Sequence, residues 1–355
     1  MKKILLISIQ LIVSLLIGLF LGNFIVPLNQ EKEINTLKGI DSLKETFSKN
    51  NSKNYLNSEK SQEIFSPYTG SLLDSESIDN IPFLCIVENS RDARPQSGLS
   101  QADLVYETMT EGGIPRFLAL FHKSFPEVIG PVRSVRPYFL NISKEHSLPF
   151  AHCGGSQEAL LAISTDDSLN SINEIKNGTA FWRDKTRKAP HNLYTSADNI
   201  RNFIKDNSLQ YSKENNLKFE DNALLNSNNY SSNINLKLSN YYNTSYKYVD
   251  GFYEKYMDGK LSIDKNTGET LKFKNIIIQI TNMSLQSDNV HIDVDLVGEG
   301  EGYLLTNGKI EKINWRKDNL NSKTTLKFED NSLVTLSSGN TIWHIVDPNS
   351  KLNFN

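Results

Sequence analysis

The stretch Pro82-Phe83-Leu84-Cys85-Ile86-Val87 decides the fold class, because it is a short apolar run that ends at the polar residues Glu88-Asn89-Ser90. Such a run, bounded by turn residues, is typical of a buried strand. Outward from it, strand-like runs (104–108, 116–122 and 149–153) alternate with helix-like segments (134–146, 157–163 and 200–204). This alternation predicts an α+β or α/β N-terminal domain with a mixed sheet over residues 80–212.

The second half of the chain has a different pattern. Residues 213–246 are rich in Asn and Ser and are predicted to form a polar linker or insertion. From residue 247 to 348, short β-rich runs are separated by turn dipeptides, of which Asp250-Gly251 and Asn307-Gly308 are strong hairpin signals. We therefore expect a small C-terminal antiparallel β domain, either a barrel or a sandwich.

The N-terminus predicts where the protein resides. Lys2 and Lys3 precede an apolar run, 4–28, that carries no charged residue. About 20 such residues match the hydrocarbon core of a bilayer, and the run lacks the Ala-x-Ala cleavage site of a signal peptide. We expect an uncleaved transmembrane helix at 1–28 in preference to a cleaved signal segment. Since the lysines remain cytoplasmic, a single pass through the cell membrane places the body on the extracytoplasmic side, after a flexible stalk at 29–79.

Composition excludes several classes of function. The formal net charge of -3 and the pI near 6.1 give no global nucleic-acid footprint, so any anion binding must be local. The only two cysteines, Cys85 and Cys153, make no disulfide framework and are expected to be buried free thiols. No zinc motif occurs, and His291 with its neighbouring aspartates is better explained as the solvated face of a strand. No cofactor or metal is expected.

A ligand-binding site is predicted from arginines that lie among turn residues. Arg133 and Arg136 are three residues apart at the start of the predicted helix, where guanidinium groups and helix N–H groups bind carboxylate or phosphate. The alternative is that these arginines pair with nearby carboxylates and hold loops in place. The predicted ligand-binding residues are Arg94, Arg133, Arg136, Gly154, Gly155, Ser156, Arg183 and Asn192.

The same region could instead be catalytic. His152 precedes Gly154-Gly155-Ser156 at a strand end, and His191 follows a turn, so the two could perform acid–base chemistry with a carboxylate. The alternative is that each histidine is a hydrogen-bonded structural residue. The candidate catalytic residues, should the protein be an enzyme, are His152, His191, Asp184 and Glu88, with Glu107 in place of Glu88 as a variant.

Several motifs in one order resemble the YerB-like bacterial surface lipoproteins, a family with a domain of unknown function 3048. They include Arg94-Pro95-Gln96-Ser97-Gly98, Glu111-Gly112-Gly113-Ile114, Gly130-Pro131-Val132-Arg133-Ser134 and Lys188-Ala189-Pro190-His191-Asn192. The resemblance runs from about residue 67 to the C-terminus and implies two-part architecture and surface tethering. This chain lacks the lipid-bearing Cys of such proteins, and Cys153 stands where a small residue is expected. The resemblance also offers a DNA helicase as a partner, which an extracytoplasmic body would not meet.

Three functional hypotheses follow. The preferred one is a membrane-tethered extracytoplasmic protein that binds an anionic component of the cell envelope, peptidoglycan or a linked polymer, as a binding or regulatory module. The second is a hydrolase or lyase that acts on the same cell-wall material. The third is a protein-interaction partner of an envelope or helicase factor, docked through the C-terminal β domain. A non-enzymatic role is preferred, and nucleic acid is not an expected partner.

Overall fold

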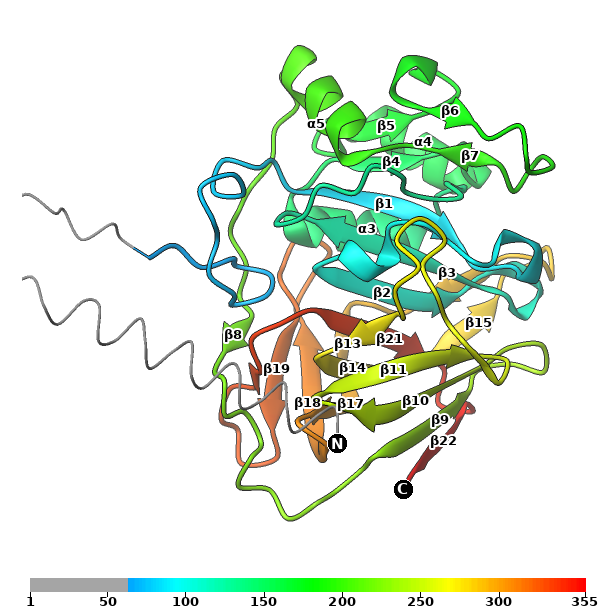
Figure 1. Ribbon diagram of the computed structural model, residues 1–355. Helices are drawn as coiled ribbons and strands as arrows, with labels where there is room; N and C mark the ends of the chain where they lie inside the picture. The colour runs from blue at the N-terminus through cyan, green and yellow to red at the C-terminus, as the bar shows by residue number, and fades with distance from the viewer. Residues whose placement is uncertain (1–62) are drawn as a thin grey trace, which may run out of the picture. The chain divides into compact units, whose positions relative to one another are not determined.

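The computed structural model describes residues 63–355, which form one compact unit (Figure 1). The predicted anchor at 1–28 and the predicted stalk as far as residue 62 lie outside the described residues. From residue 63 onward, no helix is both long and apolar enough to cross a membrane. The last part of the predicted stalk is not flexible, because Tyr68 is fully buried and its hydroxyl donates to the carbonyl of Ser212 at 3.2 Å.

A ten-stranded mixed sheet forms the centre of this unit, in the order β19-β18-β17-β14-β21-β2-β3-β1-β4-β5. Its strands are β1 (Phe83–Glu88), β2 (Leu104–Met109), β3 (Pro115–Phe121), β4 (Phe150–His152), β5 (Ser171–Asn173), β14 (Asn275–Ile280), β17 (Gly298–Thr306), β18 (Lys309–Lys317), β19 (Thr325–Phe328) and β21 (Thr341–Val346). Two groups of neighbouring strands are parallel, β1-β4-β5 and β14-β21-β2. The expected mixed sheet is therefore present.

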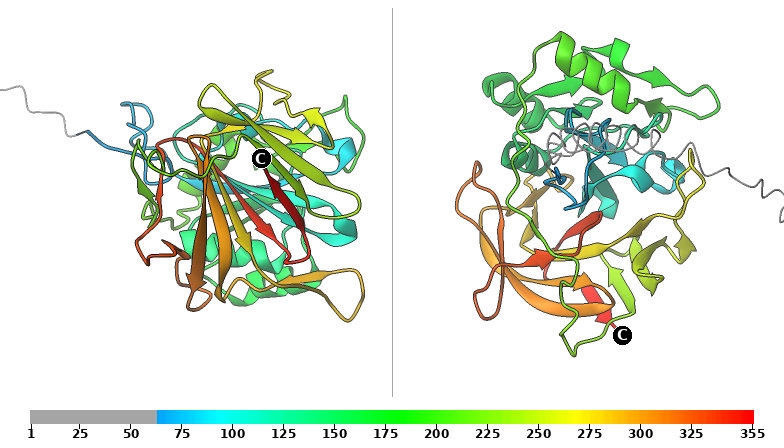
Figure 2. Two further views of the ribbon diagram at one scale, coloured as in Figure 1. Left: turned by 90° about the horizontal axis from the view of Figure 1, so that it is seen from below. Right: turned by 60° about the vertical axis from the view of Figure 1, so that its left-hand side comes forward.

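A separate antiparallel sheet occupies the lower right part of Figure 1, with the C-terminal strand β22 at its edge (Figure 2). It comprises β9 (Asn233–Lys237), β10 (Asn243–Val249), β11 (Phe252–Met257), β12 (Lys260–Leu261), β13 (Lys272–Phe273) and β22 (Lys351–Phe354). Two details differ from expectation. The segment 213–246 supplies β9 and the start of β10 rather than only a linker, and β14, β17, β18, β19 and β21 join the mixed sheet.

Both differences have a physical cause in strand patterning. β9 alternates exposed and buried positions, with Ile234 and Leu236 in the core, so its polar residues cover the solvent face of a real strand. β14 and β21 are almost wholly buried apolar runs. Strands of that kind need cover on both faces and therefore lie inside a sheet that is packed on both sides.

Within residues 63–355, helices are few and lie near β1, β4 and β5 in the upper part of Figure 1. They are α3 (Pro137–His146), α4 (Gln157–Thr165) and α5 (Ala197–Asp206), with short 3-10 helices at Arg91–Ala93, Leu99–Gln101, Glu111–Gly113 and Gly178–Ala180. Short strand pairs complete the fold: β6 (Trp182–Arg183) with β7 (Leu193–Tyr194), β8 (Lys218–Phe219) with β20 (Thr335–Leu336), and β15 (Met283–Leu285) with β16 (Ile292–Val294).

The core has two layers, one on each face of the mixed sheet. On one face, residues such as Val105 and Phe117 pack with Tyr246 and Tyr253 of the antiparallel sheet. On the other face, alternate residues such as Leu118 pack with the buried side of α3. Because side chains alternate along a strand, consecutive residues of β1 belong to different layers. The same alternation directs side chains at the carboxyl end of β1 toward opposite faces of the sheet.

Candidate functional site

The carboxyl ends of β1, β4 and β5 meet at one edge of the mixed sheet, because these three strands are parallel. Ligands of sheets with parallel strands bind beyond such ends. Arg133 lies between the ends of β1 and β4: its backbone N–H donates to the Ile86 carbonyl at 3.0 Å, and its carbonyl accepts from the Cys153 N–H at 3.0 Å. The residues that follow these strands are therefore brought close together.

Glu88 and His191 form a pair at the end of β1. Nδ1 of His191 lies 3.0 Å from each carboxylate oxygen of Glu88, and the Ser90 hydroxyl donates to the same carboxylate at 2.8 Å. Since a carboxylate only accepts hydrogen bonds, this contact requires a proton on Nδ1, and in the neutral ring Nε2 is then the basic nitrogen. Nε2 has no protein partner within residues 63–355, and the His191 side chain is 23% exposed, whereas that of Glu88 is 6% exposed.

Arginines gather beside this pair. The Nε atom of Arg133 lies 3.4 Å from Glu88, and its guanidinium makes no hydrogen bond with any residue that the structure describes. Arg116 and Arg136 share the carboxylate of Glu111, Arg116 at 3.4 Å and Arg136 in a closer contact. Burial, with the neighbouring charge of Arg136, lowers the pKa of Arg116 to about 10. Of the two arginines predicted at the helix start, Arg136 is in the closer ion pair, and Arg133 is the more available.

Arg183 and Asn192 lie at the β5 side of this edge. The Arg183 guanidinium donates to Asn192 Oδ1 and to Glu174 Oε1, both at 3.1 Å. The Cys153 thiol donates to the other oxygen of Glu174 at 3.3 Å. Burial and that carboxylate raise the pKa of the Cys153 thiol, so the thiol stays protonated and is a poor nucleophile.

His152 does not join the pair. It is fully buried, and its ring nitrogens contact the Gly154 carbonyl and the Ser171 hydroxyl, each at 2.7 Å. Burial lowers its pKa to about 4. Asp184 stabilises its own turn instead, because it accepts hydrogen bonds from the N–H and the hydroxyl of Thr186 at 2.8 and 2.7 Å. Both residues therefore have structural roles in the described geometry.

The Gly154-Gly155-Ser156 segment connects β4 to α4. The Ser156 hydroxyl accepts from the Ala159 N–H at 3.3 Å and caps that helix. Gly154 has a φ of +61° and donates its N–H to Asn173 Oδ1 at 3.0 Å. A Cβ on Gly155 would lie 2.9 Å from Val135 Cγ1, so the two glycines are explained by backbone conformation and close packing.

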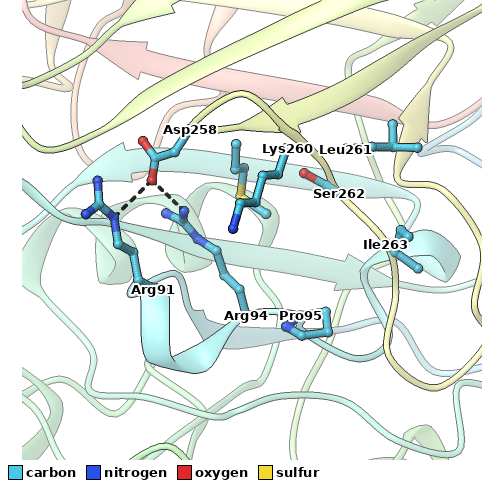
Figure 3. A pocket seen from close by; sticks show the side chains of 9 residues that line it. Arg91, Arg94, Pro95, Asp258, Lys260, Leu261, Ser262 and Ile263 are labelled. Atoms are coloured by element: carbon cyan, nitrogen blue, oxygen red, sulfur yellow. Dashed lines mark hydrogen bonds and ion pairs between the residues drawn. The ribbon is translucent and has the colours of Figure 1, made fainter.

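A pocket of about 620 Å³ lies between the loop that follows β1 and residues 257–263 (Figure 3). We call it the Arg94 pocket; it is lined by Arg91, Arg94, Pro95, Met257, Asp258, Lys260, Leu261, Ser262 and Ile263. Arg94 is fixed by three hydrogen bonds, to Asn89 Oδ1 at 3.0 Å, to the Asn89 carbonyl at 2.9 Å and to Asp258 at 2.8 Å. Sequence reasoning found Arg94 but not its partners from the C-terminal half.

A buried ionic network holds the side chain of Asn89 in place. The Asn89 amide donates to Glu107 Oε1 at 3.0 Å, and Glu107 also accepts from Tyr242 at 2.5 Å and from Lys255 at 2.8 Å. Burial is the largest single influence and alone would raise the pKa of Glu107, but the charge and hydrogen bond of Lys255 together with its other polar contacts lower that pKa. His344 Nδ1 is 3.2 Å from Glu107 without hydrogen-bond alignment, and burial lowers its pKa to about 3, so this ring is neutral.

One signal could have found this network from the sequence. β11 alternates between half-buried and buried positions, and Lys255 occupies a buried position between Tyr253 and Met257. A lysine on the apolar face of an alternating strand needs a buried carboxylate as its partner. Among residues 63–355, no group of three His, Cys, Asp or Glu side chains is placed to hold a metal ion.

Comparison with known proteins agrees with this architecture. Residues 68–211 match the model of the DUF3048 N-terminal domain, and residues 232–343 match that of the DUF3048 C-terminal domain, both described as of unknown function. The chain is 31% identical over 265 residues to the Bacillus subtilis (strain 168) protein named "Putative lipoprotein YerB", covering 73% of this chain and 80% of that protein. A crystal structure of the YerB protein from Bacillus subtilis matches with a TM-score of 0.73 at 30% identity, covering 82% of this chain and 100% of that chain.

Proposed function

We propose that this chain, which belongs to the DUF3048 family, is a membrane-associated extracytoplasmic protein that binds an anionic component of the bacterial cell envelope. The ligand we expect is peptidoglycan or a polymer linked to it. The similarity to a lipoprotein is consistent with a body held outside the cytoplasm, and a single membrane span at 1–28 would provide the tether. The observation that carries the binding role is the charge of the Arg94 pocket.

The Arg94 pocket has an excess of positive charge. Three cationic side chains, Arg91, Arg94 and Lys260, line it together with a single carboxylate, Asp258. Asp258 accepts from both arginines, and Lys260 has no ion-pair partner within residues 63–355 (Figure 3). An anionic group in the pocket would satisfy the remaining donors, because guanidinium and ammonium groups bind carboxylate and phosphate strongly.

The pocket is also organised before any ligand arrives. Arg94 uses one donor on each of its nitrogens to reach Asn89 and Asp258, so its planar group is held in one orientation. Fixing the cation in advance reduces the entropy lost on binding. Met257, Leu261 and Ile263 also line the pocket, which suits a ligand with an apolar part beside its charge.

The test is binding of the full chain, purified in detergent, to insoluble peptidoglycan with and without its linked anionic polymers. Replacing both Arg91 and Lys260 by alanine should weaken retention at least about tenfold and reduce its salt dependence, because two of the three cations are lost. Arg316→Ala is the matched control, since Arg316 is an exposed arginine that also pairs with acidic residues but lies on β18. Equal retention of all three proteins would refute a role for the pocket.

A second function is favoured by the Glu88–His191 pair, namely hydrolysis of the same material. A carboxylate on Nδ1 fixes the tautomer whose Nε2 can take a proton from water, and Arg133 contacts the same carboxylate. A positive group beside the base would stabilise negative charge that develops on the substrate.

Mass analysis of peptidoglycan after incubation separates the two functions. If the pair is catalytic, new fragments should form and should disappear with both Glu88→Gln and His191→Asn, while His291→Asn, at a half-exposed histidine paired with Asp288, should still release them. Retention without any new fragment would leave binding as the function.

A further inference from the structure

We propose that Arg133 forms a second anion-binding subsite, so that the ligand is a polymer with repeated anionic groups rather than one charged small molecule. This inference rests on the proposed function, because the Arg94 pocket would be the first subsite. It adds a second contact point, on the far side of the loop at residues 89–95, and it restricts the ligand class to chains with charges on successive units.

Arg133 has the properties of a positioned but unused cation. Its backbone is fixed on both sides by hydrogen bonds to Ile86 and Cys153, while its side chain is 28% exposed. A guanidinium offers five N–H donors, and within residues 63–355 none of those of Arg133 makes a hydrogen bond. The 3.4 Å contact with Glu88 holds the group near the sheet edge without satisfying it.

The surroundings of Arg133 favour an anion. Arg133 contacts Glu88, and Arg116 and Arg136 contact Glu111, so three arginines face two carboxylates in this region. The proximity of the arginines is visible in Arg116, whose pKa is lowered by burial and then by the charges of Arg136 and Arg133. A carboxylate or phosphate at Arg133 would relieve that repulsion.

The two subsites are held by consecutive residues of the chain, but they face different sides. Glu88, which contacts Arg133, is followed directly by Asn89, which holds Arg94. Side chains of consecutive residues in an extended strand point to opposite faces, so Arg133 and the Arg94 pocket flank the edge of the sheet. A single small anion can occupy one of them, whereas a chain that passes over the loop at half-buried Ser90 and exposed Arg91 can occupy both.

Binding at two linked points has a measurable signature. Once one anionic unit is held, the next unit is delivered at a high effective concentration, which raises the overall affinity by about 10²- to 10⁴-fold without new kinds of contact. The affinity for an anionic polymer should therefore increase with the length of the polymer. This increase should require both subsites, because each subsite alone should bind only weakly.

The experiment measures affinities of the full chain for inorganic phosphate, tripolyphosphate and long-chain polyphosphate by calorimetry at fixed ionic strength. Polyglutamate of matched length is a further probe, which distinguishes a carboxylate polymer from a phosphate polymer. We expect the unaltered protein to bind a molecule of long-chain polyphosphate at least about a hundredfold more tightly than it binds inorganic phosphate. Arg133→Gln should remove most of this gain while leaving monomer binding at the Arg94 pocket unchanged.

The outcomes separate this inference from the proposed function. If Lys260→Ala weakens binding of every probe but Arg133→Gln leaves the chain-length gain intact, the pocket binds anions and the second subsite is refuted. If neither variant changes any affinity, both proposals fail. Arg316→Ala controls for general loss of surface charge, and a circular dichroism melt of Arg133→Gln within about 2 °C of the unaltered protein establishes that the fold is retained.

Discussion

At the scale of single residues, Lys255 and Glu107 link the two sheets through an ion pair with no solvent access. Both side chains are fully buried and 2.8 Å apart. Lys255 also donates to Thr244 at 2.7 Å and to Tyr246 at 2.9 Å, so its three donors are all used. The pair therefore fixes how the antiparallel sheet sits on the mixed sheet, and through Asn89 it also sets the position of Arg94.

We predict that Lys255→Met lowers the free energy of unfolding by about 3–5 kcal/mol, because Glu107 would be left as a buried charge without its partner. Urea denaturation followed by circular dichroism measures this change. The double variant Lys255→Met with Glu107→Gln should recover a large part of the loss, since no buried charge remains. Lys312→Met, at an exposed position of β18, should change stability by less than about 0.5 kcal/mol. A loss as small as that of Lys312→Met would contradict the argument.

His152 gives a prediction about pH. Burial lowers its pKa from 6.5 to about 4 in the folded protein, so the unfolded chain binds this proton at a higher pH than the folded protein does. Stability is therefore fully present above pH 6.5 and falls as the pH decreases toward 4, by up to about 1.4 kcal/mol per pH unit for this group. His152→Gln should reduce the slope of unfolding free energy against pH between 6.5 and 4.5.

The slope, not the absolute stability, is the informative quantity here. The glutamine variant loses packing at every pH, but it has no proton to take up. His122 and His146 are also buried with pKa values lowered to about 4, so the remaining slope should stay well above zero. An unchanged slope in His152→Gln would show that its proton uptake does not differ between the folded and unfolded states.

At the scale of elements, Ser156 is predicted to act on α4 rather than on a ligand. Its hydroxyl caps the helix, so Ser156→Ala should cost about 1 kcal/mol, whereas Ser156→Asp should retain the cap and most of the stability. Thermal unfolding measures the cost, and polyphosphate affinity should be equal in all three proteins. Weaker binding by Ser156→Ala at unchanged stability would return this residue to the ligand-binding group.

The types of helices and strands were largely predictable from the sequence, whereas the contacts between segments far apart in the sequence were not. Asn307 and Gly308 have positive φ values of 52° and 72° and join β17 to β18, as the Asn-Gly signal predicted. The helix expected from residue 134 begins at Pro137, because the residue before a proline is held extended, as Arg136 is at φ -130° and ψ 158°.

The candidate site was predictable only where its residues are near in sequence or fall at strand ends. Glu88 ends β1, whereas Arg133 and His191 follow turns, and the fold brings all three together. The partners of Arg94 could not be predicted in this way. Asp258 and Lys260 approach it through packing of a second sheet, which no local pattern specifies.

At the scale of the whole molecule, one sheet runs through both halves of the sequence. β21 lies between β14 and β2 and is parallel to both, so it joins the strands of residues 275–346 to those of residues 83–173. All six residues of β21 are buried. Two independently stable domains, as the boundaries at 80–212 and 247–348 suggest, would leave β2 with an unpaired hydrogen-bonding edge and an uncovered apolar face.

We therefore predict that a fragment of residues 63–230 does not fold on its own, although it contains every residue of the Glu88–His191 pair and its arginines. Residues 63–355 should unfold in one cooperative transition, seen as coincident urea curves by circular dichroism and tryptophan fluorescence, because the sheet and the buried Lys255–Glu107 pair cross the division. Mixing fragment 63–230 with fragment 231–355 should restore protection of β2 amides from hydrogen exchange if the edges pair again. A cooperative transition in the isolated 63–230 fragment would instead show that β21 adds an edge to a domain that is already stable.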